Sequence, residues 1–577
     1  MRFVVLKHLF AFVLFLISGL YITYPLIFHL TNVLPGLGDE LLITWIMNWN
    51  IHSFQGDISS IFNANIFYPY ANTLAFSETF FTSSLLSLIP VKLFGEPIVA
   101  FNIALIFSLI FLGMSVYLLT FYLTKNFLPS LISGLLVVFS PAVLDKTTHL
   151  QVLTIFFVPL SILCFLKFLD NKKTLYLFFT ALFFVLQTYN SFLPGYFIVL
   201  SVISIFIFRY YKNKKEALSV FTKKSLLIIL ISLAPIVLIT IPYFQVSNKF
   251  NYSRDIRDTI HFALHPEDLL YPHPSSRLHN FMTKLVPIPK VSILQHGFLG
   301  GSFTILAVLA FFYFIRNFKK VKYIEKSLIF ISISSLLLSL GPFLHIGRQT
   351  IHHPFPVPLP YLLFYYLVPG FKGMRVSARW EMLFVLISAV LIGILLASKL
   401  KTHTKAMLIV FFVLTFAIVS EFSFPMKFVS VKNTSDFPPE YHFLKQYAPT
   451  STIIIMPIYN WDMTPYASNE TLREYYSTLS FNKMVNGFSG FSPPQWEAMA
   501  TEMIVNFPSP KTLKKIEEMK VDYVIVHTDE YERMANDNYK IRGREIKSKD
   551  EILNQIKKYE RLYLVKTYKD TYIYRLD

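Results

Sequence analysis

The sequence predicts a mainly α-helical, polytopic membrane protein with a smaller α/β domain at its C-terminal end. Hydrophobic residues make up 54% of the chain and charged residues only 15%, whereas soluble domains carry about 25% charged residues. Apolar runs of about 18 residues or more recur, and each is long enough to cross a bilayer as a helix. From about residue 430 these runs give way to short strand patterns and amphipathic helices.

Eleven segments are predicted to span the membrane. The first begins near Leu6 and is too long for the apolar core of a cleaved signal peptide, so we expect it to be retained as a signal anchor. Segment 79–94 is short and contains Pro90 and Lys92, and we expect it to lie as an interfacial helix on the outer surface. The predicted spans are 8–30, 98–124, 128–145, 150–169, 174–191, 193–210, 224–246, 299–316, 326–345, 376–398 and 406–424.

Lysine and arginine collect in alternate loops, and the intervening short loops contain little of either beyond Lys146. Because cytoplasmic loops carry an excess of these residues, we expect the N-terminus in the cytoplasm of a plasma-membrane protein. Loops 31–97, 247–298 and 346–375, and everything after about residue 425, are then extracytoplasmic. The net charge of +18 falls on the cytoplasmic loops in this interpretation, so membrane lipids are an expected partner and nucleic acid is not.

The predicted domains are a transmembrane domain, residues 1–425, and an extracytoplasmic α/β domain, residues 430–577. About 145 residues are enough to bury a core of their own. Cys164 is the single cysteine, which excludes an intrachain disulfide and a thiolate metal cluster. Strands are predicted at 452–457, 523–527, 563–567 and 571–574, and helices at 437–447, 493–506, 509–519 and 550–559.

The first outer loop opens on two carboxylates, Asp39 and Glu40, in a glycine-containing turn. Acidic groups at the edge of a bilayer are costly, which suggests a site. Asp39 is the leading candidate for a general base or a metal ligand, and a solvated turn is the alternative. Glu40 is expected to point elsewhere on the following helix, where Trp45 and Trp49 share a face as interfacial anchors or sugar-stacking rings. Glu78 closes the same loop, either as a substrate contact or as the polar start of the interfacial helix.

A second outer turn contains Asp145, Lys146, His149 and Gln151. Asp145 is a candidate catalytic carboxylate, and His149 and Gln151 are candidate substrate contacts, because the flanking spans need no charge here. An ordinary ion pair between Asp145 and Lys146 is the alternative, and a histidine beside one carboxylate is a weak metal signal. Asn190 ends an outward span, where it either faces a cavity as a substrate contact or caps the helix.

Two arginines, Arg375 and Arg379, lie at the outer end of the span 376–398, against the predicted distribution of basic residues. Their i,i+4 spacing predicts that they lie one turn apart on one face of a helix. Guanidinium groups bind phosphate well, and a helix N-terminus adds partial positive charge. The alternatives are pairing of Arg379 with Glu381 and binding of lipid headgroups. No GxGxxG, Walker A, HExxH or complete GxSxG arrangement supports soluble nucleotide or triad chemistry.

Several stretches, taken in order, make the chain resemble the GT-C superfamily of membrane glycosyltransferases. The resemblance is to a group of prokaryotic GT-C-like membrane proteins and, distantly, to the protein O-mannosyltransferases, whose first loop carries an acidic pair similar to Asp39 and Glu40. The stretches are GDELLITWIMNWN, NIFYPYANTLAFSE, FSPAVLDKTTHLQ, GFKGMRVSARW and, in the C-terminal part, VNGFSGFSPP and DYVIVHTDE.

This resemblance implies a sugar donor linked to polyprenyl phosphate, used on the outer face with a glycan, lipid or protein acceptor. It implies Asp39 as the base that deprotonates the acceptor and Asp145 as an assisting carboxylate. The chain shows fewer convergent carboxylates than metal-dependent relatives need, so a divalent metal has no support and the cofactor stays unassigned. Two other functions remain open. A lipid or glycan flippase or transporter needs charged or broken spans or pseudo-repeats, and a non-catalytic scaffold would tolerate loss of Asp39.

Overall fold

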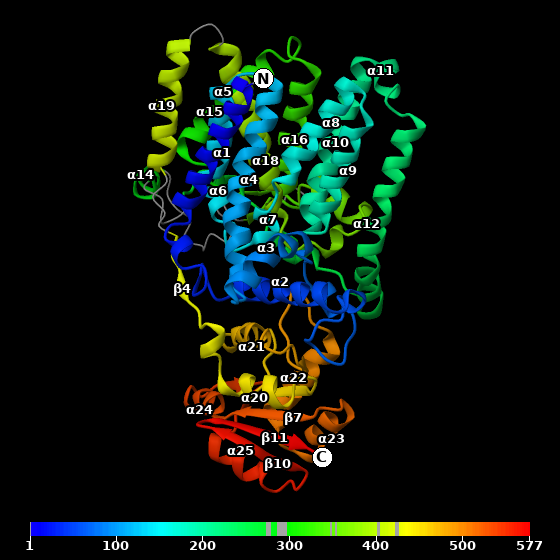
Figure 1. Ribbon diagram of the computed structural model, residues 1–577, viewed down its shortest axis with the longest axis vertical. Coiled ribbons are helices and arrows are strands. Elements are labelled where there is room, and N and C mark those ends of the chain that lie inside the picture. The colour runs from blue at the N-terminus through cyan, green and yellow to red at the C-terminus, as the bar shows by residue number, and fades with distance from the viewer. Residues whose placement is uncertain are drawn as a thin grey trace. The chain divides into compact units, whose positions relative to one another are not determined.

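The computed structural model describes residues 2–272, 278–285, 297–346, 349–351, 355–400, 404–421 and 426–577. The chain divides into two compact units, and each is described by itself (Figure 1). Unit 1 comprises Met1–Phe28, Ala104–Thr240 and Tyr252–Met426. Unit 2 comprises His29–Ile103, Ile241–Asn251 and Lys427–Asp577.

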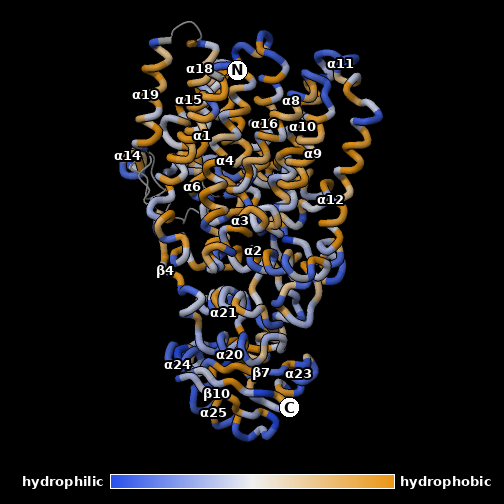
Figure 2. Tube along the Cα trace, in the orientation of Figure 1, coloured by the Kyte–Doolittle hydropathy of each residue, from blue (hydrophilic) through white to orange (hydrophobic). Residues whose placement is uncertain are grey.

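Unit 1 consists mainly of helices, which carry mostly hydrophobic residues (Figure 2). Two helices, α4 (Val99–Thr124) and α12 (Lys223–Phe250), also contribute residues to unit 2. A short antiparallel pair joins β2 (His345–Ile346) to β3 (Gln349–Thr350). The other helices are α1 (Arg2–Ile22), α5 (Phe127–Val138), α6 (Pro141–Leu144), α7 (Leu150–Leu153), α8 (Phe157–Asn171), α9 (Thr174–Thr188), α10 (Phe192–Lys212), α11 (Lys214–Leu218), α13 (Ile256–His261), α14 (His279–Leu285), α15 (Gly301–Arg316), α16 (Tyr323–Ser339), α17 (Pro360–Leu367), α18 (Glu381–Lys399) and α19 (Thr404–Glu421).

Six helical segments in the described part of the chain are long and apolar enough to cross a membrane. By this criterion the chain is a polytopic membrane protein, as the sequence predicts. The total of eleven spans stays a prediction. One predicted span, 128–145, is divided because α5 ends at Val138 and α6 begins at Pro141, where a proline fits only the first turn of a helix. The six segments are Val4–Ile22, Val99–Thr124, Leu150–Asn171, Phe192–Lys212, Lys223–Phe250 and Ser377–Lys399.

Glycines allow the helices of unit 1 to approach closely. A methyl group at Gly134 of α5 would lie 2.3 Å from the Phe15 ring of α1 and 2.7 Å from the carbonyl oxygen of Gly113 in α4. A methyl group at Gly393 of α18 would lie 2.1 Å from Ser133 Oγ of α5. Small residues at helix contacts are how apolar helices pack when lipid competes for the same surfaces.

The N-terminal segment of unit 2 folds around α2 (Asp39–Gln55), which begins after Gly38 and ends before Gly56. Trp45 donates its indole N–H to Asn65 Oδ1 at 3.0 Å, and Trp49 donates to the carbonyl of Ile61 at 2.7 Å. Both rings are buried. They lie on one helix as predicted, but they are core residues of unit 2 rather than exposed anchors or stacking surfaces. The predicted helix at 79–94 is α3 (Phe81–Phe94), with Pro90 inside it.

A five-stranded sheet forms the centre of the C-terminal part of unit 2 (Figure 1). Its order is β10-β11-β7-β5-β6, with β5 parallel to both β6 and β7, and β11 antiparallel to both β7 and β10. β5 is a fully buried run, TIIIM, as expected of a strand covered on both faces. The strands are β5 (Thr452–Met456), β6 (Lys483–Met484), β7 (Tyr523–His527), β10 (Leu562–Tyr568) and β11 (Thr571–Leu576).

The four predicted strands of this part are all present, and so are the four predicted helices, as α20, α22, α23 and α25. Two helices, α21 and α24, were not expected, because their short polar patterns resemble turns. A small hairpin joins β8 (Lys540–Ile541) to β9 (Arg544–Glu545). The helices are α20 (Pro439–Tyr447), α21 (Asn469–Ser477), α22 (Pro494–Asn506), α23 (Pro510–Glu518), α24 (Thr528–Asn536) and α25 (Lys549–Ile556).

Within unit 2 the N-terminal segment is joined to the C-terminal part. β1 (Val33–Leu34) pairs with β4 (Val429–Ser430). The Asn65 amide donates to the carbonyl of Asn482 at 3.0 Å and to Ser477 Oγ at 3.1 Å. The Phe67 ring meets Trp496 edge to face with centroids 4.8 Å apart. Residues 29–103 therefore pack against the α/β part. The domain boundary at about residue 425 stays a prediction.

Candidate functional site

Asp39 and Glu40 occupy the first turn of α2 in unit 2 and point in different directions, as the helical pattern predicts. Asp39 is exposed and Glu40 is buried. The backbone N–H of Gly38 donates to Glu40 Oε2 at 3.1 Å, and a methyl group at Gly36 would lie 2.5 Å from Glu40 Oε1. Burial raises the pKa of the Glu40 carboxyl above its ordinary value, against the lowering effect of backbone hydrogen bonds. Glu40 therefore stabilises the turn that presents Asp39.

Glu78 also belongs to unit 2, and it is half-buried in the extended segment before α3. The helix begins only at Phe81, so Glu78 does not start it. Asp145, His149, Gln151, Asn190, Arg375 and Arg379 all belong to unit 1. The predicted site residues thus fall into a unit 2 group and a unit 1 group.

Asp145 ends the short helix α6, and Lys146 Nζ donates to Asp145 Oδ2 at 2.7 Å. The pair is not an ordinary surface ion pair, because the Lys146 side chain is only 6% exposed and that of Asp145 is 22% exposed. Taking two charges out of water is costly unless they stay close together. The structure therefore contains the ion pair between Asp145 and Lys146, which was the alternative to a catalytic role for Asp145. The pair is shielded from solvent, unlike an ion pair in a solvated turn.

His149 and Gln151 follow within the same turn. His149 precedes α7, and its Nδ1 lies 2.8 Å from Thr148 Oγ1. Gln151 is buried in α7, and its Oε1 has no hydrogen-bond partner among the described residues. Asn190 is fully buried just after the end of α9. A buried amide oxygen with no donor is costly, and it is the kind of group that a bound ligand or water satisfies.

The two arginines do not share a helix face, which corrects the predicted spacing. Arg375 lies before the short 3₁₀ helix Ser377–Trp380 that contains Arg379, and α18 starts only at Glu381. The extended backbone at Val376 separates Arg375 from this helix. The Arg375 guanidinium lies over the Phe262 ring, 4.7 Å from its centroid, an arrangement that is favourable for a cation.

Glu381, which sequence reasoning treated only as a partner for Arg379, is a conspicuous buried group of unit 1. It is the first residue of α18, it is 1% exposed, and neither carboxylate oxygen has a hydrogen-bond partner among the described residues. Lys146, Asp145 and Asp268 interact with it electrostatically. The sequence signal was available: a carboxylate at the start of an otherwise apolar span is expensive and marks a functional position.

The structure therefore brings three carboxylates and one ammonium group together at the ends of α6 and α18. Asp268 is fully buried, and its Oδ2 accepts the backbone N–H of His265 at 2.9 Å. Gly297 lies beside Glu381, since a methyl group there would come within 3.1 Å of Oε1. Among the described residues, no group of three or more histidine, cysteine, aspartate or glutamate side chains is placed to hold a metal ion.

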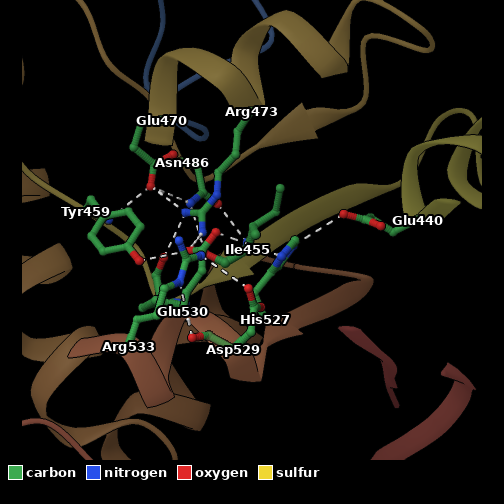
Figure 3. Close-up of polar contacts among 11 residues, drawn as sticks. Glu440, Ile455, Tyr459, Glu470, Arg473, Asn486, His527, Asp529, Glu530 and Arg533 are labelled. Atoms are coloured by element: carbon green, nitrogen blue, oxygen red, sulfur yellow. Dashed lines mark hydrogen bonds and ion pairs between the residues drawn. The ribbon is translucent and has the colours of Figure 1, made fainter. Parts of the chain in front are cut away.

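A separate buried network lies where β5 and β7 end in unit 2 (Figure 3). Arg473 is buried and donates to Glu470 Oε1 at 2.7 Å, to Glu530 Oε2 at 2.6 Å and to the carbonyl of Pro457 at 2.7 Å. Burial opposes ionisation of Glu530, but the Arg473 guanidinium holds the pKa of that carboxyl below its ordinary value. Arg473, which lies on α21, thus connects this helix to α24 through Glu530 and to the residue after β5 through the carbonyl of Pro457.

The same network contains further carboxyl groups. Tyr459 donates its hydroxyl to Glu530 Oε2 at 2.7 Å, and His527 Nε2 lies 3.5 Å from Glu440 Oε1. Burial raises the pKa of Glu440 and of Glu470, and raises that of Glu474 strongly. Arg473 bonds to Glu470 and Glu530, and Tyr459 bonds to Glu530, so we interpret this part of the network as structural support for the sheet.

Comparisons with known proteins place the fold. The structure is similar to the crystal structure of the Archaeoglobus fulgidus oligosaccharyltransferase in complex with Zn and sulfate, at a TM-score of 0.50 and 13% identity, over 91% of this chain and 68% of that one. The resemblance expected from the sequence is thus confirmed as a likeness in fold to this membrane oligosaccharyltransferase. No family model matches the chain, and no curated protein matches it.

Two further structures are similar at lower scores. The archaeal oligosaccharyltransferase AglB from Archaeoglobus fulgidus, in complex with an inhibitory peptide and a dolichol-phosphate, has a TM-score of 0.48 at 12% identity, over 99% of this chain and 74% of that one. The arabinofuranosyltransferase AftD from Mycobacteria has a TM-score of 0.47 at 11% identity, over 99% of this chain and 40% of that one.

Proposed function

We propose that the protein is a membrane glycosyltransferase that transfers a sugar from a polyprenyl-phosphate-linked donor to a glycan, lipid or protein acceptor at the outer face of the membrane. The observation that carries the proposal is the shielded group of Asp145, Lys146 and Glu381 at the ends of α6 and α18. A fold does not by itself assign an activity. Here, however, a fold similar to that of an oligosaccharyltransferase is combined with a buried carboxylate at the start of an apolar helix, where such a group is costly.

The proposed reaction is an inverting transfer. An acceptor hydroxyl oxygen forms a bond to the anomeric carbon of the donor sugar while the bond from that carbon to the phosphate oxygen breaks. The electron pair of the broken bond stays on polyprenyl phosphate, and the acceptor proton passes to the exposed carboxylate of Asp39, which acts as the general base. Arg375 and Arg379 stabilise the charge that develops on the leaving phosphate.

The remaining residues have supporting roles in this proposal. Glu40 holds the turn that presents Asp39. Asp145, with Lys146 and Glu381 beside it, assists the transfer, and Glu78, His149, Gln151 and Asn190 contact the substrates. The unsatisfied Gln151 Oε1 is a suitable acceptor for a sugar hydroxyl.

The test uses membranes that contain the full chain or a variant. They are supplied with polyprenyl-phosphate-linked radiolabelled sugars, and the labelled products are separated. We expect Asp39→Asn to remove nearly all transfer and Glu381→Gln to reduce it at least tenfold, both at unchanged protein level. Asp436→Asn, at an exposed position, is the matched control and should retain transfer.

Full activity of Asp39→Asn and Glu381→Gln would contradict the proposal and leave a scaffold as the better description. Donor lipid crossing the bilayer in reconstituted vesicles, without transfer, would instead identify a flippase.

The orientation needs its own experiment. In a Cys164→Ala background, Lys558→Cys and Lys215→Cys each introduce one exposed thiol. We expect a membrane-impermeant maleimide to label the cysteine at 558 in intact cells and the one at 215 only after permeabilisation. The reverse pattern would place the candidate site on the cytoplasmic side.

A further inference from the structure

A cleft of about 530 Å³ opens in the C-terminal part of unit 2, away from every residue assigned a role above. It lies between α20, the segment before it, and β10. Its volume falls within the range of about 300–1,000 Å³ that is usual for small-molecule sites. The lining residues are Ser435, Phe437, Pro439, His442, Phe443, Gln446, Tyr447, Lys566 and Tyr568.

Aromatic rings dominate the walls of the cleft. Phe437 and Phe443 are buried, whereas Tyr447 is 66% exposed and Tyr568 is half-buried. The Phe443 and Tyr447 rings have centroids 5.3 Å apart. The Lys566 ammonium lies 5.8 Å from the centroid of Tyr568. The cleft thus offers two accessible aromatic faces with a cation beside one of them.

The polar side chains of the cleft are not engaged with the rest of the protein. Ser435, His442, Gln446 and Lys566 make no side-chain hydrogen bond or ion pair with any other described residue, and the buried His442 Nε2 is one of the orphaned atoms of the unit. The side chains of Ser435, Gln446 and Lys566 are exposed, so the cleft retains hydrogen-bonding capacity that a ligand can reach.

The neighbouring sheet edge argues against an extended peptide as that ligand. β10 is an edge strand and would be the natural place for strand addition. Its pairing with β11 shifts between Leu564 and Lys566, and a bulge and a lysine on an edge are devices that prevent strand addition. A compact ligand is therefore favoured over an added strand.

We propose that this cleft binds a saccharide. The C–H faces of a sugar ring pack against Tyr447 and Tyr568, while its hydroxyl groups hydrogen-bond to Gln446 and Ser435. Because Lys566 and no carboxylate lines the cleft, a saccharide that carries a carboxylate or phosphate binds more tightly than a neutral one of the same length. This is recognition of a glycan away from the reacting groups, and it does not require that transfer occurs.

The test measures binding of fluorescent oligosaccharides to the purified full chain in detergent, with no donor lipid present. The probes are two defined series, one neutral and one containing uronic acids. We expect Tyr447→Ala and Tyr568→Ala each to weaken binding about tenfold, and Lys566→Met to weaken binding of the acidic series while sparing the neutral one. Tyr563→Ala on the same strand and Lys445→Met on α20 are matched controls, since both positions are exposed and outside the lining.

Absence of binding by either series, or equal loss in the lining and control variants, would overturn the inference. So would competition by an extended peptide but not by free oligosaccharide. If sugar transfer persists but saccharide binding fails, this cleft is not a saccharide site and the proposed function still stands. If saccharide binding persists but transfer is absent, the cleft stands and the proposed function does not.

Discussion

Lys146 supplies the positive charge beside Asp145 and Glu381 in unit 1. Breaking a buried ion pair by removing one partner costs about 3–5 kcal/mol. We expect Lys146→Met to lower the unfolding temperature of the detergent-solubilised protein clearly. Lys320→Met, at an exposed position, should change it little.

The same variant has an internal control. Adding Asp145→Asn to Lys146→Met removes the uncompensated negative charge, so most of the lost stability should return. If the double variant is no more stable than Lys146→Met alone, the loss came from packing of the lysine stem rather than from the charge.

Glu474 gives a pH-dependent prediction. It is fully buried, Oε1 accepts the backbone N–H of Phe488 at 2.5 Å, and burial raises its pKa well above the ordinary value. The folded protein therefore holds this proton more tightly than the unfolded chain. The resulting stability is fully present below the ordinary carboxyl pKa and is lost as pH rises toward the folded-state pKa.

We expect Glu474→Gln to flatten this dependence. Thermal unfolding measured between about pH 5 and about pH 9 should show the variant close to the wild type at the acidic end and more stable at the alkaline end. Glu518→Gln, at an exposed position of α23, is the control. A variant that is less stable than the wild type at every pH would mean that Glu474 is ionised in the folded protein.

Individual site residues were predictable where the signal is local. The different directions of Asp39 and Glu40 follow from their adjacency on a helix, where consecutive side chains are about 100° apart. Glu381 was undervalued because its burial depends on Lys146, Asp268 and Gly297, which are distant in sequence. The saccharide cleft was not foreseen for the same reason: β10 and α20 contribute its walls from positions more than a hundred residues apart.

Secondary-structure elements were predicted best where composition is strong. β5 and β7 were expected because runs of isoleucine and valine bounded by polar residues fit buried strands. Breaks inside apolar runs were predicted poorly. The sequence predicts one continuous segment where the structure has α5 and α6, and it predicts a helix that includes Arg375. Apolar periodicity continues through a 3₁₀ turn, so it does not reveal where the α-helix begins.

The contact of α1 with α5 depends on the absence of a side chain at Gly134. Because a methyl group there would lie 2.3 Å from the Phe15 ring, we expect Gly134→Leu to separate the two helices. Overpacking of this kind costs about 1–3 kcal/mol. The measurement is thermal unfolding in detergent.

Gly373→Ala is the matched control, since a methyl group there meets nothing within 4 Å. Recovery of Gly134→Leu by Phe15→Ala would confirm that the two side chains compete for one space. If the double variant is no more stable than Gly134→Leu alone, the contact is not the cause.

At the scale of the whole molecule, the α/β part packs against a segment that lies far from it in the sequence. Residues 29–103 supply β1, the Asn65 amide and the Phe67 ring to it. We expect residues 427–577 expressed alone to be digested faster by a protease and to unfold at a lower temperature than the same residues in the full chain.

A second preparation makes that comparison sharper. Adding a separately produced 29–103 segment should restore part of the protease resistance, and Asn65→Ala in that segment should reduce the effect. Equal stability of the isolated and intact forms would show that the boundary at about residue 425 delimits an independent domain.

The pairing of Val33 with Ser430 has a consequence for biosynthesis. Roughly 400 residues separate the two strands, and at about 5–20 residues per second a ribosome needs about 20–80 s to make them. During that interval the nascent 29–103 segment has emerged with its tryptophans but without its partner. Throughout that interval the segment has to persist without β4, so we expect a holding chaperone that binds it to raise the yield of the folded chain.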